Sequence, residues 1–170
     1  MTVIRELLGS ISFADTADPP DFVGREAELA ELAEFCRGRA AYRLWVGDPY
    51  AGKSALLAHF LMRGDDSDTV MVGFFIKRTD QRRNSADGFL RSLSRQLCLL
   101  LGERDTSGAS FLELQHELPG LLVKASEHAT ASGQTLLLVI DALDEEIYQS
   151  KGPEETPSIA ELLPCPTPAG

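Results

Sequence analysis

Gly47-Asp48-Pro49-Tyr50-Ala51-Gly52-Lys53-Ser54 is the stretch that decides the fold, because it matches the pattern G-x-x-x-x-G-K-[ST] at every fixed position. It follows a hydrophobic segment of strand type, residues 42–46, and precedes a segment with one apolar helical face. Glycines let the backbone turn so that successive N–H groups point at phosphate oxygens. The stretch therefore predicts a phosphate-binding loop between a strand and a helix.

Each residue type in the predicted loop has a task in binding a nucleotide. Lys53 would bring positive charge to the β- and γ-phosphates, and the Ser54 hydroxyl would ligate Mg²⁺. A helix over residues 54–63 would aim the positive end of its dipole at the same anion. The predicted nucleotide-binding residues are Gly47, Asp48, Pro49, Tyr50, Ala51, Gly52, Lys53, Ser54 and Ala55.

Length and composition indicate one soluble globular domain, with 170 residues, 44% hydrophobic and 25% charged. No apolar run is long enough for a membrane span and no signal peptide is evident, so a cytoplasmic protein is expected. The net charge of −10 argues against direct binding to nucleic acid. The cysteines have no metal spacing, and Cys36 and Cys98 are predicted to be buried thiols.

Strand and helix patterns alternate along the chain, which predicts a parallel α/β sheet covered by helices. Residues 1–21 form a turn-rich leader or linker, residues 22–163 the domain, and residues 164–170 a proline-rich end. A proline inside the third long helical pattern, Pro119, predicts a kink or a break into two helices. The expected strands are 42–46, 69–76 and 135–140, and the expected helices are 25–38, 54–63, 85–101, the pattern around Pro119 and 159–163.

A second group of candidate residues follows the third strand, Leu136-Leu137-Leu138-Val139-Ile140-Asp141. Hydrolysis of ATP needs one acidic residue for the Mg²⁺ shell and another to orient the attacking water. Asp141 is the candidate for the metal. Asp144 and Glu145 compete for the catalytic role, with Glu145 slightly favoured, although acidic residues at a helix start would also suit this position.

One basic cluster stands out in the acidic chain: Lys77, Arg78, Arg82 and Arg83. A solvated loop is the favoured interpretation. Because the cluster directly follows the strand at 69–76, the alternative is that it faces the nucleotide edge of the sheet.

Three motifs occur in a characteristic order: Phe22-Val23-Gly24-Arg25-Glu26-Ala27-Glu28-Leu29, then Trp45 through Ser54, then Leu138 through Glu145. Over about residues 22–163 the chain resembles the STAND class of P-loop ATPases, and within it NACHT-type modules of bacterial multidomain proteins. The resemblance implies a three-layer α/β/α fold of ASCE type that binds ATP or ADP with Mg²⁺. It also implies a signalling switch coupled to homo-oligomer assembly and to other domains or effector proteins.

The resemblance places the segment Val23, Gly24 and Arg25 near the adenine. It implies five parallel strands in the order 5-1-4-3-2, of which only the first three core strands are recognisable here. A strand is missing between residues 42–46 and 135–140, so the chain is expected to be a fragment that is marginally stable or prone to aggregate.

Three functions remain open from the sequence. The leading one is an ATP-binding, Mg²⁺-dependent switch with ATP hydrolysis. A non-hydrolysing interaction module or truncated regulator would bind nucleotide without turnover. A small-molecule kinase would also use a phosphate loop, but no acceptor pocket or arginine-rich lid is identifiable, and no N-K-x-D segment follows Asp141 to indicate guanine.

Overall fold

The computed structural model describes residues 24–38, 42–48, 51–63, 68–80, 82–145 and 156–164. Within these ranges, helices alternate with two parallel strands, a mixed α/β order that agrees with the predicted alternation. In chain order the elements are α2 (Glu26–Arg37), α3 (Lys53–Arg63), β1 (Thr69–Phe75), α4 (Ala86–Leu101), α5 (Phe111–Ala131), β2 (Thr135–Asp141), the 3-10 helix η1 (Leu143–Glu145) and α6 (Ile159–Leu162).

The two strands form one parallel pair. Their register runs from Thr69 opposite Thr135 to Phe75 opposite Asp141, so both strands end at the same edge. β1 is buried over most of its length, as expected for a strand covered on both faces. Helices α4 and α5 both lie on the chain between the two strands, and this long connection is what a parallel pair requires.

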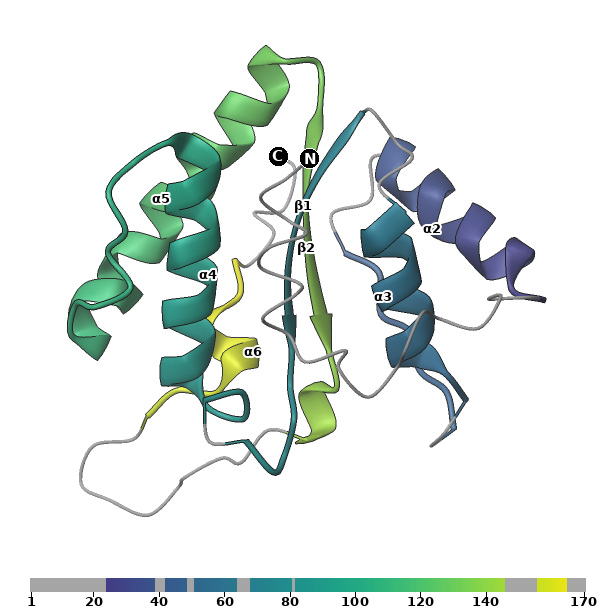
Figure 1. Cartoon of the computed structure of the whole chain (residues 1–170), viewed down its shortest axis with the longest axis horizontal. Helices are drawn as coiled ribbons and strands as arrows, with labels where there is room; N and C mark the ends of the chain where they lie inside the picture. The colour runs from purple at the N-terminus through teal and green to yellow at the C-terminus, as the bar shows by residue number, and fades with distance from the viewer. Residues whose placement is uncertain are drawn as a thin grey trace, which may run out of the picture.

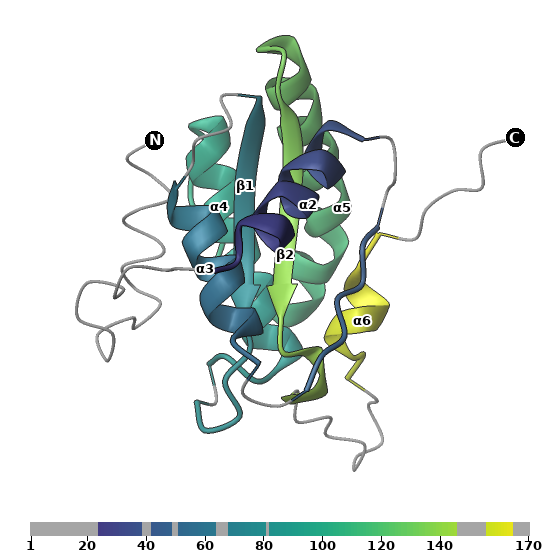
Figure 2. The ribbon, with the colours of Figure 1, turned by 90° about the vertical axis from the view of Figure 1, so that its right-hand side faces the viewer.

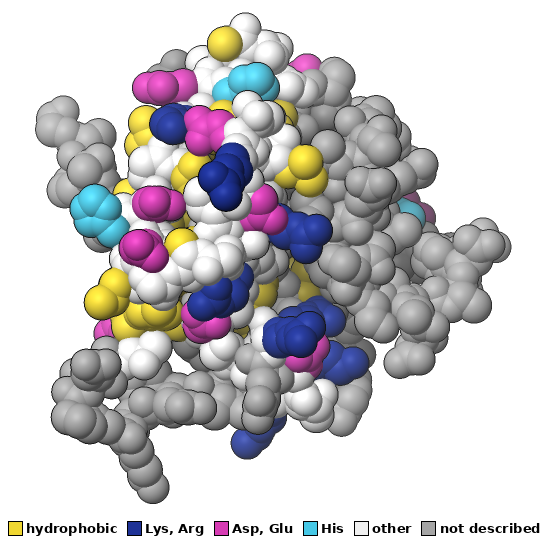
Figure 3. All heavy atoms as spheres, turned by 60° about the vertical axis from the view of Figure 1, so that its left-hand side comes forward, with side chains coloured by type: hydrophobic (Ala, Val, Ile, Leu, Met, Phe, Trp, Pro, Cys, Tyr) yellow, Lys and Arg dark blue, Asp and Glu magenta, His cyan; other side chains and the backbone are white. Residues whose placement is uncertain are grey.

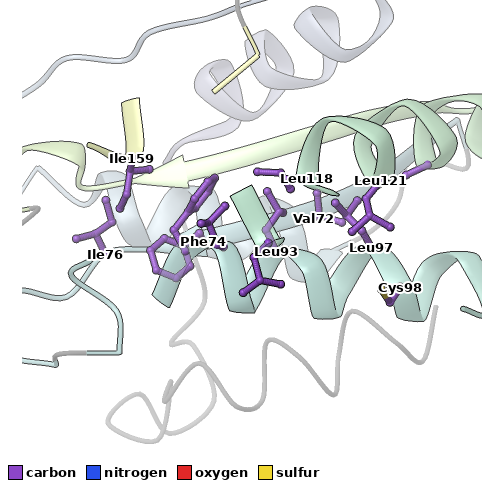
Figure 4. Close-up of a cluster of buried hydrophobic side chains, with 13 residues drawn as sticks. Val72, Phe74, Ile76, Leu93, Leu97, Cys98, Leu118, Leu121 and Ile159 are labelled. Atoms are coloured by element: carbon purple, nitrogen blue, oxygen red, sulfur yellow. The ribbon is translucent and has the colours of Figure 1, made fainter. Parts of the chain in front are cut away.

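Helices cover both faces of the sheet, so the described part of the molecule has three layers (Figure 1). On one face, alternate residues of β1 pack against α4, α5 and α6. Figure 4 shows these side chains converging, with Phe74 of β1 and Ile159 of α6 on the same side of the sheet. Phe74 meets Phe89 edge to face, with ring centroids 5.5 Å apart.

The opposite face of the sheet packs against α2 and α3. Met71 and Phe75 point to this side, since side chains alternate along a strand. They join Leu56 and Leu61 of α3 and Leu32 of α2 in a second buried cluster. Cys36 lies in this cluster and Cys98 in the first, which confirms that both thiols are buried.

Short sequence signals fix the ends of α4 and α5. Ser85 caps α4 by accepting a hydrogen bond from the Gly88 amide, and Gly102 ends the helix with a left-handed φ of 66°. Ser110 and Glu113 form a reciprocal capping box at the start of α5. α4 therefore begins and ends close to the predicted bounds, 85–101.

The helix α5 runs without a break through Pro119, so of the two predicted outcomes the break into two helices is wrong and the kink stays a prediction. Proline removes one helical hydrogen bond and usually interrupts the helix. Here Leu118 and Leu121 flank the turn and are both buried against the first core cluster, whereas Pro119 itself is exposed. Packing on both sides of the proline holds the helix together.

Residues 42–46 do not form the predicted strand. The described segment 42–48 has no regular structure, and the sheet of the described residues contains only β1 and β2. Figure 2 shows the segment running beside β2 with a space between them, on the side away from β1. A strand needs backbone hydrogen bonds to a neighbouring strand, and in the described sheet this segment pairs with neither β1 nor β2.

One hydrophobic side chain of this segment is packed, and two others are exposed. Trp45 packs against the α2 and α3 cluster, whereas Leu44 and Val46 are 78% and 86% exposed. An ion pair between Arg43 and Glu31 also ties the segment to α2. Side-chain contacts therefore hold this segment beside α2 and α3 without strand pairing.

The surface over α4 and α5 carries interspersed charges of both signs (Figure 3). Several of them are paired, including Arg91 with Asp87 and Lys124 with Glu103. None of the helices that the structure describes is long and apolar enough to cross a membrane.

Candidate functional site

The candidate site lies at the end of the sheet toward which both strands point. η1 and the start of α3 lie at this end in both ribbon views (Figures 1 and 2). Open α/β sheets bind ligands outside the carboxyl ends of their strands. The described parts of the phosphate-loop motif and the residues after β2 therefore share one end of the molecule.

The phosphate-loop motif leads directly into α3, whose first residue is Lys53. The Lys53 ammonium folds back over the motif and donates to the carbonyl oxygens of Gly47 at 2.6 Å and Asp48 at 3.0 Å. The Ala51 amide donates to the Asp48 carbonyl at 3.2 Å. These contacts close the described part of the loop on itself, with the lysine bridging its first two residues.

Gly52 supplies the backbone conformation that the motif requires. Its φ of +77° is in the left-handed region, which is energetically unfavourable for any residue that has a side chain. Its carbonyl accepts the first helical hydrogen bond of α3, from the Leu56 amide at 2.9 Å. Ser54 and Ala55, which follow Lys53, are exposed at the start of the helix. Pro49 and Tyr50 lie outside the described residues.

Arg25 reaches the phosphate-loop motif from the start of α2. One guanidinium nitrogen, Nη2, donates to the Ala51 carbonyl, and the other, Nη1, donates to the Glu28 carboxylate at 2.8 Å. The pKa of Glu28 is lowered by hydrogen bonds from its own backbone and from Arg25. Gly24 precedes Arg25 with a φ of +89°, and Val23 lies outside the described residues.

Asp141 is the last residue of β2 and is buried, with 7% of its surface exposed. Its carbonyl accepts a hydrogen bond from the Ile76 amide at 3.1 Å, so the backbone of Asp141 is held by the neighbouring strand. Ala142 follows with a φ of +61°, an unusual conformation for a residue other than glycine. The backbone thus changes direction directly after Asp141, which lies at the edge of the sheet.

The two catalytic candidates occupy the turn after Asp141. Asp144 and Glu145 are both in η1, and the Asp144 side chain is exposed. The Glu145 side chain lies outside the described residues. Among the described residues no group of three or more His, Cys, Asp or Glu side chains could hold a metal ion. The predicted magnesium ligands, Ser54 and Asp141, remain a prediction.

The basic cluster lies on a compact loop after β1. The loop is closed by backbone hydrogen bonds, including one from the Lys77 amide to the Arg83 carbonyl at 3.0 Å. The Arg83 guanidinium donates twice to the Phe75 carbonyl, at 3.1 and 3.0 Å. The buried Asn84 amide donates to the Arg78 carbonyl at 2.8 Å. The loop has a definite fold at the end of β1, and Lys77, Arg78 and Arg82 are exposed on it.

Two residues near the site were not predicted to matter. Gln96 of α4 accepts from the Gly73 amide at 3.0 Å and donates to the Gly73 carbonyl at 2.8 Å, so it pairs with the edge of β1 that β2 leaves open. Gly88 packs against the loop so closely that a Cβ there would overlap the Arg82 carbonyl. The only sequence signal for these contacts was a polar residue, Gln96, on the mostly apolar buried stripe of α4.

Comparison with known proteins gives one family match. The family described as nephrocystin 3, N-terminal, matches residues 30–164. The chain belongs to this family. The matched region includes the phosphate-loop motif, both strands and the Asp141 turn, and it begins after Arg25. No curated protein and no solved structure matches the chain.

Proposed function

We propose that this chain is the nucleotide-binding core of a STAND-class P-loop ATPase, which binds ATP or ADP with Mg²⁺. The observation that carries the proposal is the Lys53 ammonium lying across a glycine loop at the start of α3, within 3.0 Å of the Gly47 and Asp48 carbonyls. A cation beside backbone amides at a helix start is chemistry suited to a polyphosphate.

The residues present fit a nucleotide with its metal. Lys53 would exchange its two carbonyl contacts for phosphate oxygens, and the amides of residues 51–54 would donate to the same phosphates. Ser54 and Asp141 would hold the Mg²⁺ shell, since hydroxyl and carboxylate oxygens are the ligands that this ion prefers. Bound Mg²⁺ would neutralise charge on the β- and γ-phosphates.

Hydrolysis is the second part of the proposal. Either Glu145 or Asp144 would orient the attacking water from the turn after β2. Assembly into homo-oligomers and contact with other domains or effector proteins would make the nucleotide state a signal. A cytoplasmic location suits these partners. The chain would bind nucleotide even if it serves as a non-hydrolysing interaction module, so binding and turnover need separate tests.

Nucleotide binding is tested by titrating the whole chain with a fluorescent ATP analogue, with and without Mg²⁺. Lys53→Ala should weaken binding by at least roughly tenfold, because charged hydrogen bonds to phosphate are lost. Lys124→Ala is the matched control, since it removes the same charge from the exposed surface of α5. Equal affinity in the unmutated chain and Lys53→Ala would reject the proposed site.

Turnover is tested by phosphate release at saturating MgATP. Glu145→Gln or Asp144→Asn should abolish release while leaving ATP affinity within a factor of about two, since neither would hold the phosphates in the ground state. Binding without release in the unmutated chain would leave the interaction module as the function. Release that both variants retain would show that neither acid orients the water.

A further inference from the structure

We propose that Arg25 is a positioning residue for the phosphate loop, acting through the Ala51 carbonyl. This role rests on the proposed nucleotide-binding function and differs from the adenine contact that the family resemblance implies. The supporting observation is that both terminal nitrogens of the guanidinium already bind protein groups, Ala51 on one side and Glu28 on the other.

The guanidinium is held from the α2 side by a short, fixed link. Glu28 lies one helical turn after Arg25 and pairs with it at 2.8 Å. Hydrogen bonds from its own backbone and from Arg25 lower the pKa of Glu28, so this carboxylate stays charged at neutral pH. α2 in turn packs on α3 through Leu32 and Leu56 in one buried cluster. The guanidinium group of Arg25 therefore has a defined position relative to the start of α3.

The bond to Ala51 determines the direction of the next amide. In a planar trans peptide the carbonyl of one residue and the N–H of the following residue point in opposite directions. Because the Ala51 carbonyl points at Arg25, the Gly52 N–H points away from Arg25. Gly52 is the fixed glycine directly before the lysine, where the motif presents amides to phosphate. We infer that Arg25 preorganises this amide donor.

Orientation is a better account of Arg25 than simple attraction. Its positive charge is paired with Glu28, so the net charge that the pair offers to a nucleotide is small. A Cβ placed on Gly52 would lie 3.7 Å from the guanidinium, which puts Arg25 against the backbone of the loop itself. Without the arginine, the peptide between residues 51 and 52 would be free to rotate. Nucleotide binding would then have to restrict this rotation, and the entropy lost would weaken the affinity.

The test compares two ligands that share phosphates and differ in the base. The whole chain, unmutated and Arg25→Ala, is titrated with MgATP and with magnesium tripolyphosphate. Arg25→Ala should weaken both ligands by the same factor, roughly five- to tenfold, so the ratio of the two dissociation constants stays constant. A merely structural defect would lower the melting temperature without this matched loss.

Three results would overturn the role of Arg25. Weaker ATP binding with unchanged tripolyphosphate binding would mean that Arg25 serves the base. Unchanged affinity for both ligands would mean that the bond to Ala51 has no consequence for binding. Failure of the unmutated chain to bind either ligand would reject the proposed function as well. This result can be told apart from the other two because it is seen in the unmutated chain alone.

Matched variants separate orientation from charge and from folding. Arg37→Ala removes the same charge from the last turn of α2 and should leave both affinities unchanged. Glu28→Gln leaves Arg25 unneutralised, so tighter tripolyphosphate binding in that variant would favour attraction over orientation. If Arg25→Ala does not unfold cooperatively, Arg25→Lys is tested in its place. Its ammonium keeps one donor, so it should recover part of the lost affinity, by the same factor for both ligands.

Discussion

The two faces of the sheet differ in how completely they are covered. On the side of α4, α5 and α6, the buried core residues keep between 0% and 6% exposure, and Phe89, Leu93 and Leu114 have none. On the side of α2 and α3, the corresponding core residues keep between 2% and 9% exposure. The segment 42–48 beside this second layer leaves Leu44 and Val46 largely exposed. One layer is closed within the described chain, and the other is not.

The two edges of the strand pair differ in the same way. Side chains bind part of the outer edge of β1, because Gln96 bonds both backbone groups of Gly73 and Arg83 bonds the Phe75 carbonyl. Beyond β2 the described residues supply no further strand. An edge closed by side chains cannot accept a new strand without losing those bonds. Any strand added to this sheet would therefore join at β2, next to the phosphate-loop side.

The largest expected effect tests the difference between the two faces. Phe89→Ala should lower the free energy of unfolding by about 3–5 kcal/mol, because it empties a fully buried site against Phe74. Leu44→Ala, at an exposed site, should change it by less than about 0.5 kcal/mol. Urea unfolding measures both. A loss above about 2 kcal/mol in Leu44→Ala would show that this segment is packed in solution.

The closed edge of β1 is tested at Gln96. Gln96→Leu keeps the side chain buried but leaves the Gly73 amide and carbonyl without their partner, so a loss of roughly 2–4 kcal/mol is expected. The same change at the half-buried Gln115 of α5 is the control and should cost much less. Equal losses in the two variants would mean that the Gly73 bonds add little to stability.

A smaller effect concerns the fit of α4 against the basic loop. Gly88→Ala should cost roughly 1–3 kcal/mol, because the new methyl group overlaps the Arg82 carbonyl. Gly120→Ala on α5 is the matched control, as no atom lies within 4 Å of its Cβ position. That variant should gain stability by up to about 1 kcal/mol, since alanine favours helices. Stabilisation by both changes would show that the loop yields without cost.

Local patterns predicted the helices and the two paired strands well. The apolar stripe of α4, with Phe89, Leu93 and Leu97, and the caps at Ser85 and Gly102 contain all the information that this helix needs. The predicted strand at residues 42–46 and the predicted helix break at Pro119 were wrong, because each outcome depends on what lies alongside the segment. A strand pattern needs a second backbone, and a helix with a proline survives if its flanks are buried.

The candidate site residues come from local patterns, and their roles stay predictions. The motif at residues 47–54 identified Lys53, and the apolar strand identified Asp141 as a carboxylate at its end. The contact between Arg25 and Ala51 joins residues 26 positions apart, so no local pattern could reveal it. The Gln96 bonds to Gly73 cross 23 positions and were equally hidden.

The amino-acid sequence by itself determined which segments are helical, because helical patterns depend on neighbours within a few positions, and it also supplied the residues that we propose for phosphate binding. Only the tertiary structure decided the register of β1 and β2, the bonds of Gln96 to the outer edge of β1, and that residues 42–48 form no strand of the described sheet. Backbone hydrogen bonds between strands join residues far apart in the chain, so whether a strand forms depends on the strand available beside it.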